Sequence, residues 1–183
     1  MNDFIKSKGF PVLLALLFHT VTEAQFSPQG NHAMDSMFPV GFPLKNKDFI
    51  RVSSVFGYRL HPIDHQWKFH GGIDLVAEKG KPIYATANGI ASKVDYENGY
   101  GNYIIISHWK DIKTLYGHLW ICLVQQGDII QQGQLIGFVG DTGRATGSHL
   151  HYELWYNKKK LSPLALWKHC INIKINTENI YRG

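Results

Sequence analysis

The sequence predicts an all-β fold, an antiparallel sandwich or barrel-like sheet, and three observations support this prediction. Glycine recurs about once in six residues between Gly71 and Gly147, with 13 glycines in 77 residues. Short runs rich in β-branched and aromatic residues separate these glycines, as expected for strands joined by tight turns. Beyond residue 25, no stretch of 12 residues keeps a helical spacing of apolar side chains. Short strands at this spacing are typical of antiparallel sandwiches and barrels.

The individual elements follow from these runs and from the turn residues between them. The expected strands cover residues 82–86, 90–94, 103–108, 135–139 and 150–156. Asn-Gly pairs at residues 88–89 and 98–99 favour the positive φ angles of tight hairpins, and polar turns at 126–128 and 141–143 separate other runs. Residues 124–130 and 130–136 resemble each other and are interpreted as successive turns of one hairpin. Near the end of the chain, residues 164–168 are compatible with a short helix.

The length of the chain fits one domain preceded by an export signal. With 183 residues, of which 44% are hydrophobic and 18% charged, the chain has the composition of one globular domain. Lys6 and Lys8, followed by an apolar run at residues 10–18, predict a cleaved signal peptide over residues 1–24. We therefore expect an N-terminal tail at 25–41, the folded domain at 42–170 and a C-terminal tail at 171–183. The signal predicts export to the periplasm, the cell envelope or the exterior.

Charge and cysteine content exclude several classes of protein. Two cysteines exclude a disulfide-framework mini-protein and a Cys-rich zinc finger, and spacing leaves open whether Cys122 and Cys170 form a bridge. The net charge of +5 is modest and the basic run at 158–160 is typical of a solvated turn, so no nucleic-acid partner is expected. No other apolar stretch approaches the roughly 20 residues that span a bilayer, so no membrane insertion is expected after signal removal.

The ten histidines of the sequence are compatible with a metal site or an acid–base site, and the candidate residues lie in three short motifs. His70 and Asp74 lie four residues apart, with glycines between them that favour an extended backbone. His149 and His151 would share one face of a strand. His118 ends an alternating apolar stretch. Each motif alone is more often structural, but together they offer three ligands and two further imidazoles, the inventory of a hydrolytic zinc site with an open position for water.

Six short motifs, taken in order along the chain, carry a family resemblance. They are Phe56-Gly-Tyr-Arg-Leu-His-Pro-Ile, His70-Gly-Gly-Ile-Asp74, Gly99-Tyr-Gly-Asn-Tyr, Leu115-Tyr-Gly-His118, Gln132-Gly-Gln-Leu-Ile-Gly and Thr146-Gly-Ser-His149-Leu-His151-Tyr-Glu. Over about residues 42–156 the chain resembles the lysostaphin-type (LytM-like) zinc endopeptidases of bacterial cell walls. The resemblance implies a β-sandwich of the duplicated hybrid motif type, with the zinc site in an open groove.

The resemblance also implies roles for five side chains. His70, Asp74 and His151 correspond to the zinc ligands, while His118 and His149 correspond to the catalytic imidazoles. Which of these two is the general base stays open. The other six histidines are given no catalytic role.

Residues around these five are candidates for secondary roles. Ser148 stands where members of the family often carry proline, a change that removes no ligand. Tyr58 and Arg59 belong to a segment that flanks the groove in relatives, and either could stack on a stem peptide or grip its carboxylate. Asn31 and His32 raise the question of whether the N-terminal tail occupies the open zinc position, as in some latent relatives.

The function implied by the resemblance is that of a secreted, monomeric zinc endopeptidase acting on peptidoglycan. The metal would activate a water molecule, and the imidazoles would move protons and stabilise the oxyanion. Cross-links between D-alanine and a diamino acid, or a glycine bridge, would both be compatible substrates. The alternative is a non-catalytic LytM-like regulator that binds and activates a cell-wall amidase, and the five intact site positions argue against it.

Overall fold

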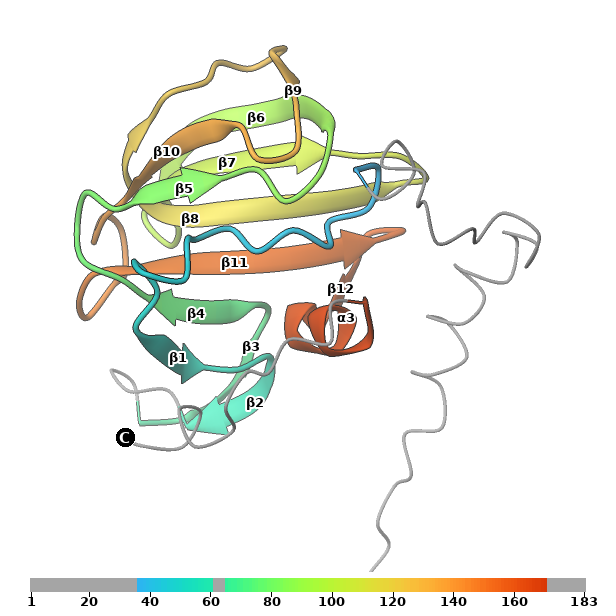
Figure 1. Ribbon diagram of the computed structural model, residues 1–183. Coiled ribbons are helices and arrows are strands. Elements are labelled where there is room, and N and C mark those ends of the chain that lie inside the picture. The colour runs from blue at the N-terminus through green and yellow to red at the C-terminus, as the bar shows by residue number, and fades with distance from the viewer. Residues whose placement is uncertain (1–35, 61–64, 171–183) are drawn as a thin grey trace, which may run out of the picture. The chain divides into compact units, whose positions relative to one another are not determined.

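The computed structural model describes residues 36–60 and 65–170, which form a nearly all-β domain (Figure 1). The all-β antiparallel prediction is confirmed. The predicted signal peptide, Asn31 and His32 of the tail, and residues 171–183 lie outside the described residues. The side chain of Cys170 lies outside them too, so its pairing with Cys122 stays a prediction.

Twelve strands and one helix follow one another in the described residues. They are β1 (Arg51–Ser54), β2 (Gly57–Leu60), β3 (Trp67–His70), β4 (Ile73–Val76), β5 (Pro82–Tyr84), β6 (Gly89–Glu97), β7 (Gly101–Ser107), β8 (Ile112–Cys122), β9 (Ile129–Ile130), β10 (Leu135–Val139), β11 (His149–Tyr156), β12 (Lys159–Leu161) and α3 (Pro163–Cys170). The helix falls where the sequence was compatible with one. Within the described residues, no helix is long and apolar enough to cross a membrane.

Ten of the strands form one antiparallel sheet that forks along its long central strand, β8. One edge of β8 pairs with β7, and β6 and β9 continue outward from there. The other edge is shared, because residues 112–117 pair with β11 whereas residues 119–122 pair with β10. The branch that begins with β11 continues through β4 to β1, and the branch that begins with β10 continues to β5. Strands β2 and β3 form a separate two-stranded sheet (Figure 1).

His118 lies at the fork and its backbone is bent there. Its φ angle is 62°, a left-handed conformation that is uncommon outside glycine, and its amide donates to the carbonyl oxygen of Tyr100 at 2.7 Å. The bend lets β8 leave β11 and join β10. The fork thus places a histidine where the two branches of the sheet separate.

The hydrophobic core lies on the face of β11 opposite to its histidines. Leu150 and Tyr152 are fully buried in this core, while His149 and His151 alternate with them on the other face. Trp167 of α3 stacks on Tyr152 with ring centroids 5.1 Å apart, so the helix covers this side of the sheet. Packing against the core therefore holds the two histidines of β11 in place from behind.

Two of the predicted connections are wrong. Residues 124–136 are not one hairpin, because β9 pairs with β6 whereas β10 pairs with β5 and β8. The two similar segments are separate turns, in which Gly127 and Gly133 adopt positive φ angles of 101° and 78° and send the following strands to different partners. Residues 88–89 do not form a hairpin turn either, since β5 and β6 are not paired.

A Leu150→Ala substitution tests whether the histidine strand is anchored through the core. We expect the free energy of unfolding to fall by about 2–5 kcal/mol, because the change opens a cavity at a fully buried position. Urea denaturation followed by circular dichroism measures this loss. Leu123→Ala, at a position that is 48% exposed, is the matched control and should change the free energy by less than about 0.5 kcal/mol. Equal losses in the two variants would contradict this packing.

Candidate metal centre

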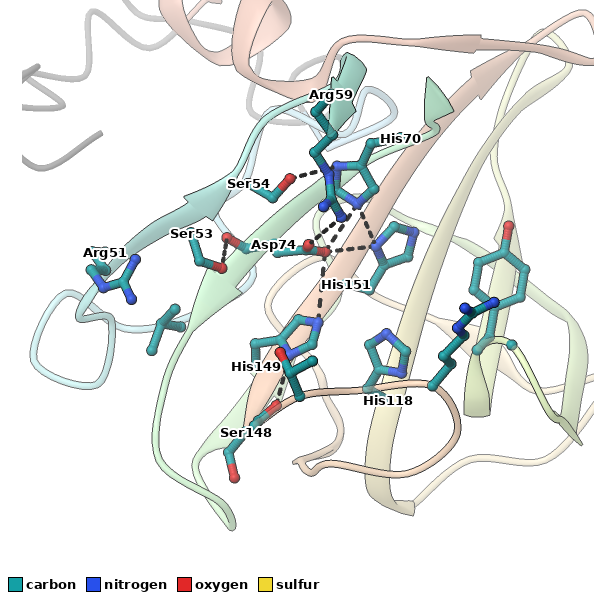
Figure 2. Close-up of a pocket in the computed structure, with 16 residues that line it drawn as sticks. Arg51, Ser53, Ser54, Arg59, His70, Asp74, His118, Ser148, His149 and His151 are labelled. Atoms are coloured by element: carbon teal, nitrogen blue, oxygen red, sulfur yellow. Dashed lines mark hydrogen bonds and ion pairs between the residues drawn. The ribbon is translucent and has the colours of Figure 1, made fainter. Parts of the chain in front are cut away.

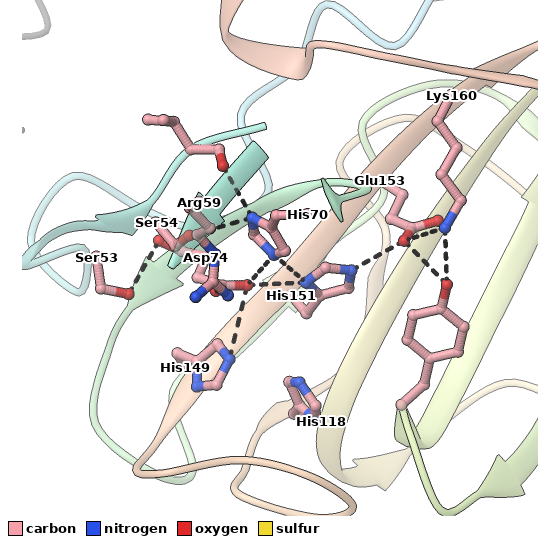
Figure 3. Close-up of polar contacts among 12 residues, drawn as sticks. Ser53, Ser54, Arg59, His70, Asp74, His118, His149, His151, Glu153 and Lys160 are labelled. Atoms are coloured by element: carbon pink, nitrogen blue, oxygen red, sulfur yellow. Dashed lines mark hydrogen bonds and ion pairs between the residues drawn. The ribbon is translucent and has the colours of Figure 1, made fainter. Parts of the chain in front are cut away.

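The three side chains that the sequence singled out as metal ligands lie together in the structure (Figure 3). His70 Nε2 lies 3.2 Å from Asp74 Oδ1, and His151 Nδ1 lies 2.8 Å from the same oxygen. The two imidazole nitrogens are 3.2 Å apart. Among the described residues, this is the group of histidine, cysteine and acidic side chains that has the spacing of metal ligands.

Strand pairing and the close approach of the backbone at Gly72 bring these ligands together. Asp74 of β4 pairs with His151 of β11, so the two side chains share one face of the sheet. His70 ends β3, and the chain then passes close to β11 on its way into β4. A Cβ atom on Gly72 would lie only 2.4 Å from the backbone oxygen of Tyr152. A side chain at Gly72 would therefore force the backbone, and His70 with it, away from β11.

Hydrogen bonds on the far nitrogens turn the lone pairs of both imidazoles toward Asp74. His70 Nδ1 lies 2.9 Å from the carbonyl oxygen of Val55, which can only accept, so we assign the proton to Nδ1. His151 Nε2 donates to Glu153 Oε1 at 3.1 Å. Two nitrogens that carry no proton (bare nitrogens) and a carboxylate oxygen thus converge. The distances between them are close to the ~3.3 Å that separates two ligand atoms of a tetrahedral zinc ion. This donor set fits a zinc ion.

Electrostatics favour a positive charge at this point. Burial alone would raise the pKa of Asp74, but hydrogen bonds with His151 and His70 outweigh it and hold the pKa far below its usual value. Burial alone would lower the pKa of His151, but its hydrogen bonds with Asp74 and Glu153 raise the pKa to about 9. The two carboxylates therefore stabilise either a proton on His151 or a metal cation in its place.

Glu153 is a site residue to which the sequence analysis gave no role. Its side chain is 1% exposed, and its Oε1 accepts from His151 Nε2, from Lys160 Nζ at 2.7 Å and from the Tyr100 hydroxyl at 2.9 Å (Figure 3). Burial alone would raise the pKa of Glu153, but its hydrogen bond with His151 and the nearby Lys160 lower it to about 2. Its position two residues after His151 was the available signal, since alternate residues of a strand share a face.

A Glu153→Gln variant is expected to bind zinc about 10- to 100-fold more weakly, the range typical of changes to a group that orients a metal ligand. The neutral amide cannot hold the His151 N–H with the strength of a buried carboxylate, so the lone pair on Nδ1 is less well directed. Competition against a fluorescent chelator measures the zinc affinity. Glu97→Gln, at an exposed position of β6, is the control. An unchanged affinity in Glu153→Gln would rule out this orienting role.

His118 and His149 form a second pair beside the three ligands (Figure 2). Their ring centroids are 4.6 Å apart. His118 Nδ1 donates to the carbonyl oxygen of Thr142 and His149 Nδ1 donates to that of Gly147, both at 2.8 Å, so each Nε2 is bare. Burial, with a smaller contribution from the neighbouring His149 imidazole, lowers the pKa of His118 to about 4. His118 is thus a neutral imidazole at physiological pH, able to accept a proton.

An open groove of about 710 Å³ contains both groups of residues. All five side chains predicted for the site line it, and so do Arg59 and Ser148. Arg59 Nη2 lies 3.7 Å from Asp74 Oδ2. Tyr58 is 76% exposed on the opposite face of β2 and is not among the lining residues. Of the two candidate substrate-binding residues, the structure therefore brings only Arg59 to the groove.

Comparisons with known proteins agree with this geometry. The model of a family described as peptidase family M23 matches residues 68–163. The DD-carboxypeptidase/endopeptidase Mpg of Neisseria meningitidis is 44% identical over 126 residues, which are 69% of this chain and 29% of the relative. The peptidoglycan DD-endopeptidase ShyC of Vibrio cholerae is 49% identical over 111 residues, which are 60% of this chain and 26% of the relative. The chain thus spans less than a third of the length of these curated relatives.

A solved structure extends the comparison to the fold. The catalytic domain of the antimicrobial peptidase lysostaphin from Staphylococcus simulans superposes with a TM-score of 0.60 at 27% sequence identity. The match covers 67% of this chain and 94% of that domain. The fold expected from the resemblance is therefore confirmed.

Proposed function

The chain belongs to peptidase family M23, and from this premise we propose that it is an exported zinc endopeptidase that hydrolyses cross-links or stem peptides of peptidoglycan. The observation that carries the proposal is the convergence of three ligand atoms beside two bare imidazole nitrogens in one open groove. The names of the relatives, a DD-endopeptidase of peptidoglycan among them, support the substrate class. We further propose that the mature protein is monomeric.

Zinc would be held by His70 Nε2, Asp74 Oδ1 and His151 Nδ1. When bound, zinc supplies the Lewis acidity that activates a water molecule and polarises the scissile carbonyl. Asp74 provides the negative charge of the ligand set, and Glu153 orients His151 by accepting its Nε2 proton. Three protein ligands leave room for water and substrate, as in other hydrolytic zinc sites.

His118 and His149 handle the protons in this proposal. A bare Nε2 accepts the proton that the attacking water loses, and the backbone carbonyl on Nδ1 stabilises the imidazolium that forms. A protonated Nε2 can donate a hydrogen bond to the oxyanion of the tetrahedral intermediate. The proton held on Nε2 then passes to the nitrogen of the leaving amine as the carbon–nitrogen bond breaks. The pair therefore supplies both the base and the acid that amide hydrolysis needs.

Digestion of purified peptidoglycan of known chemistry tests the proposed activity. We expect a new amine terminus in the products, and its chemical identity defines the scissile bond. A chelator should abolish the new terminus, and added zinc should restore it. The absence of a new terminus on every wall type, with zinc bound to the protein, would overturn the peptidase assignment. Equal cleavage with and without chelator would overturn the metal requirement alone.

Export is a separate part of the proposal, because it depends on residues outside the described structure. N-terminal sequencing of protein recovered from the cell envelope should find that the chain starts near Gln25. Intact residues 1–24 on the recovered protein would contradict the cleaved signal.

A further inference from the structure

Two tight hairpin turns lie side by side at one end of the domain (Figure 1). The turn between β7 and β8 has Lys110 and Asp111 at its centre, and the turn between β11 and β12 has Asn157 and Lys158. The amide of Asn157 donates to the carbonyl oxygen of Asp111 at 3.3 Å, so the two turns form one surface. We call this surface the turn pair, and it also includes the flanking residues Trp109, Lys113 and Lys159.

The turn pair carries positive charge that the domain does not neutralise. Its exposed lysines are Lys110, Lys113, Lys158 and Lys159. Within the described part of the chain, no carboxylate lies within ion-pair distance of any of these four, and Asp111 is the only acidic residue of the turn pair. By contrast, Lys79 and Lys93 on other surfaces lie 2.9 Å and 3.5 Å from carboxylate oxygens.

The fold divides the basic run at residues 158–160. Lys160 turns back toward the metal centre, where its ammonium group donates to Glu153 at 2.7 Å. Lys158 and Lys159 are exposed and make no such contact within the described residues. Only these two residues of the run therefore match the solvated turn that the sequence indicated, and they are the ones that belong to the turn pair.

Lysine is an unfavourable residue at the centre of these turns. Positive φ angles at both central residues are typical of type I′ turns, for which Asn-Gly is a favoured sequence. Lys110 and Lys158 have φ angles of 51° and 64°, a left-handed conformation that side chains other than glycine adopt uncommonly. Both turns thus place a lysine where glycine would fold more readily. Backbone strain of this kind is concentrated at functional positions.

The side chains of the turn pair suit the headgroup region of an anionic membrane. Trp109 is 43% exposed, and Lys110 Nζ lies 4.3 Å from the centroid of its ring. Tryptophan is enriched at membrane–water interfaces because its ring is apolar and its N–H is polar. Lysine binds phosphate as a point charge, whereas arginine is the residue that matches a carboxylate with two parallel hydrogen bonds. Since the turn pair contains lysines and no arginine, its charge fits lipid phosphates better than the carboxylates of a wall peptide.

We propose that the turn pair binds the surface of an anionic phospholipid membrane without inserting across it. The turns lie at the end of β8 and β11 that is remote from the groove residues His118 and His149. Tyr156 ends β11, about 16 Å along the strand from the ligand His151. A domain that rests on the turn pair would therefore keep the groove clear of the lipid. The inference goes beyond the proposed peptidase function and does not depend on it.

Co-sedimentation of the protein with lipid vesicles tests this inference. One set of vesicles is phosphatidylcholine alone, and the other contains about one-third phosphatidylglycerol, which makes the surface potential negative. We expect binding to the anionic vesicles only, and we expect it to weaken as salt is added because the lysines are exposed to solvent. Residues outside the described structure are identical in all variants, so a difference between variants measures the turn pair.

A pair of double variants with equal net charge isolates the lysines of the turn pair. Lys158→Gln combined with Lys159→Gln should weaken binding to anionic vesicles by roughly fivefold for each lysine removed. Lys45→Gln combined with Lys47→Gln removes the same charge from exposed positions before β1 and should leave binding nearly unchanged. Both double variants should cleave a soluble cross-linked peptide as the unmodified protein does, because none of these lysines lines the groove.

A Lys158→Gly variant separates a loss of binding from a loss of folding. Glycine adopts the left-handed conformation without strain, so we expect the Tm to rise by a few degrees while binding to anionic vesicles falls about fivefold. A variant that bound less because it was misfolded would have a lower Tm.

Three outcomes would overturn the inference and leave the peptidase function in place. The first is equal binding of the two double variants to anionic vesicles. The second is equal binding to vesicles with and without phosphatidylglycerol. The third is binding to purified peptidoglycan sacculi that depends on Lys158 and Lys159, with no binding to anionic vesicles, which would assign the turn pair to the wall.

Discussion

An Asp74→Asn variant is expected to lose measurable hydrolysis and to bind zinc at least about a hundredfold more weakly. Asparagine keeps the shape of the side chain but removes the negative charge that the cation needs. Asp74 Oδ1 also contacts both His70 and His151, and Asp74 Oδ2 faces Arg59, so the neutral amide leaves a positive group without its counterion. The loss should exceed that of Glu153→Gln, which alters only the group behind a ligand.

The decisive measurement is zinc content after dialysis against a competing chelator, followed by a peptidoglycan digest. Asp141→Asn is the matched control, because Asp141 is an exposed carboxylate paired with Lys79 and does not line the groove. This control should retain zinc and activity. An Asp74→Asn protein that kept both would show that the three converging side chains are not the metal ligands.

Local sequence patterns predicted the ligands because each ligand belongs to a short motif. His149 and His151 face one way because strand residues alternate, and the glycines after His70 allow its approach to β11. Glu153 obeys the same alternation, but its function appears only once Lys160 and Tyr100 are seen to donate to it. These residues come from three separate strands or turns, a relation that spacing along the chain does not contain.

The fold was predictable where glycines delimit apolar runs, and less so elsewhere. All five strands expected from such runs are present, at β5, β6, β7, β10 and β11. Strands β1 to β4 are four residues long and mix polar with apolar side chains, so no run marks them. The fork in β8 depends on a bent backbone at His118, and no glycine marks this position for a positive φ angle.

Substituting His149 or His118 by alanine should reduce kcat by about 10²- to 10⁴-fold while zinc stays bound. The range is that of removing a general acid or base, and neither side chain belongs to the ligand set. Steady-state kinetics on a soluble cross-linked peptide, with zinc content measured on the same samples, separates loss of chemistry from loss of metal. His65→Ala, at an exposed position outside the groove, controls for the loss of an imidazole and should change neither quantity.

The same two variants separate an enzyme from a regulator that only binds. A regulator of a cell-wall amidase would act through the surface of the groove, so an imidazole-to-methyl change that preserves zinc and fold should leave its effect on the wall intact. An endopeptidase should lose that effect in proportion to kcat, because both bare Nε2 atoms face the ligands and have backbone carbonyls fixed behind them. Two hydrogen bonds that fix proton positions on adjacent imidazoles are of no use to a docking surface, but they are what proton transfer requires. An unchanged effect on the wall with kcat abolished would therefore decide for the regulator.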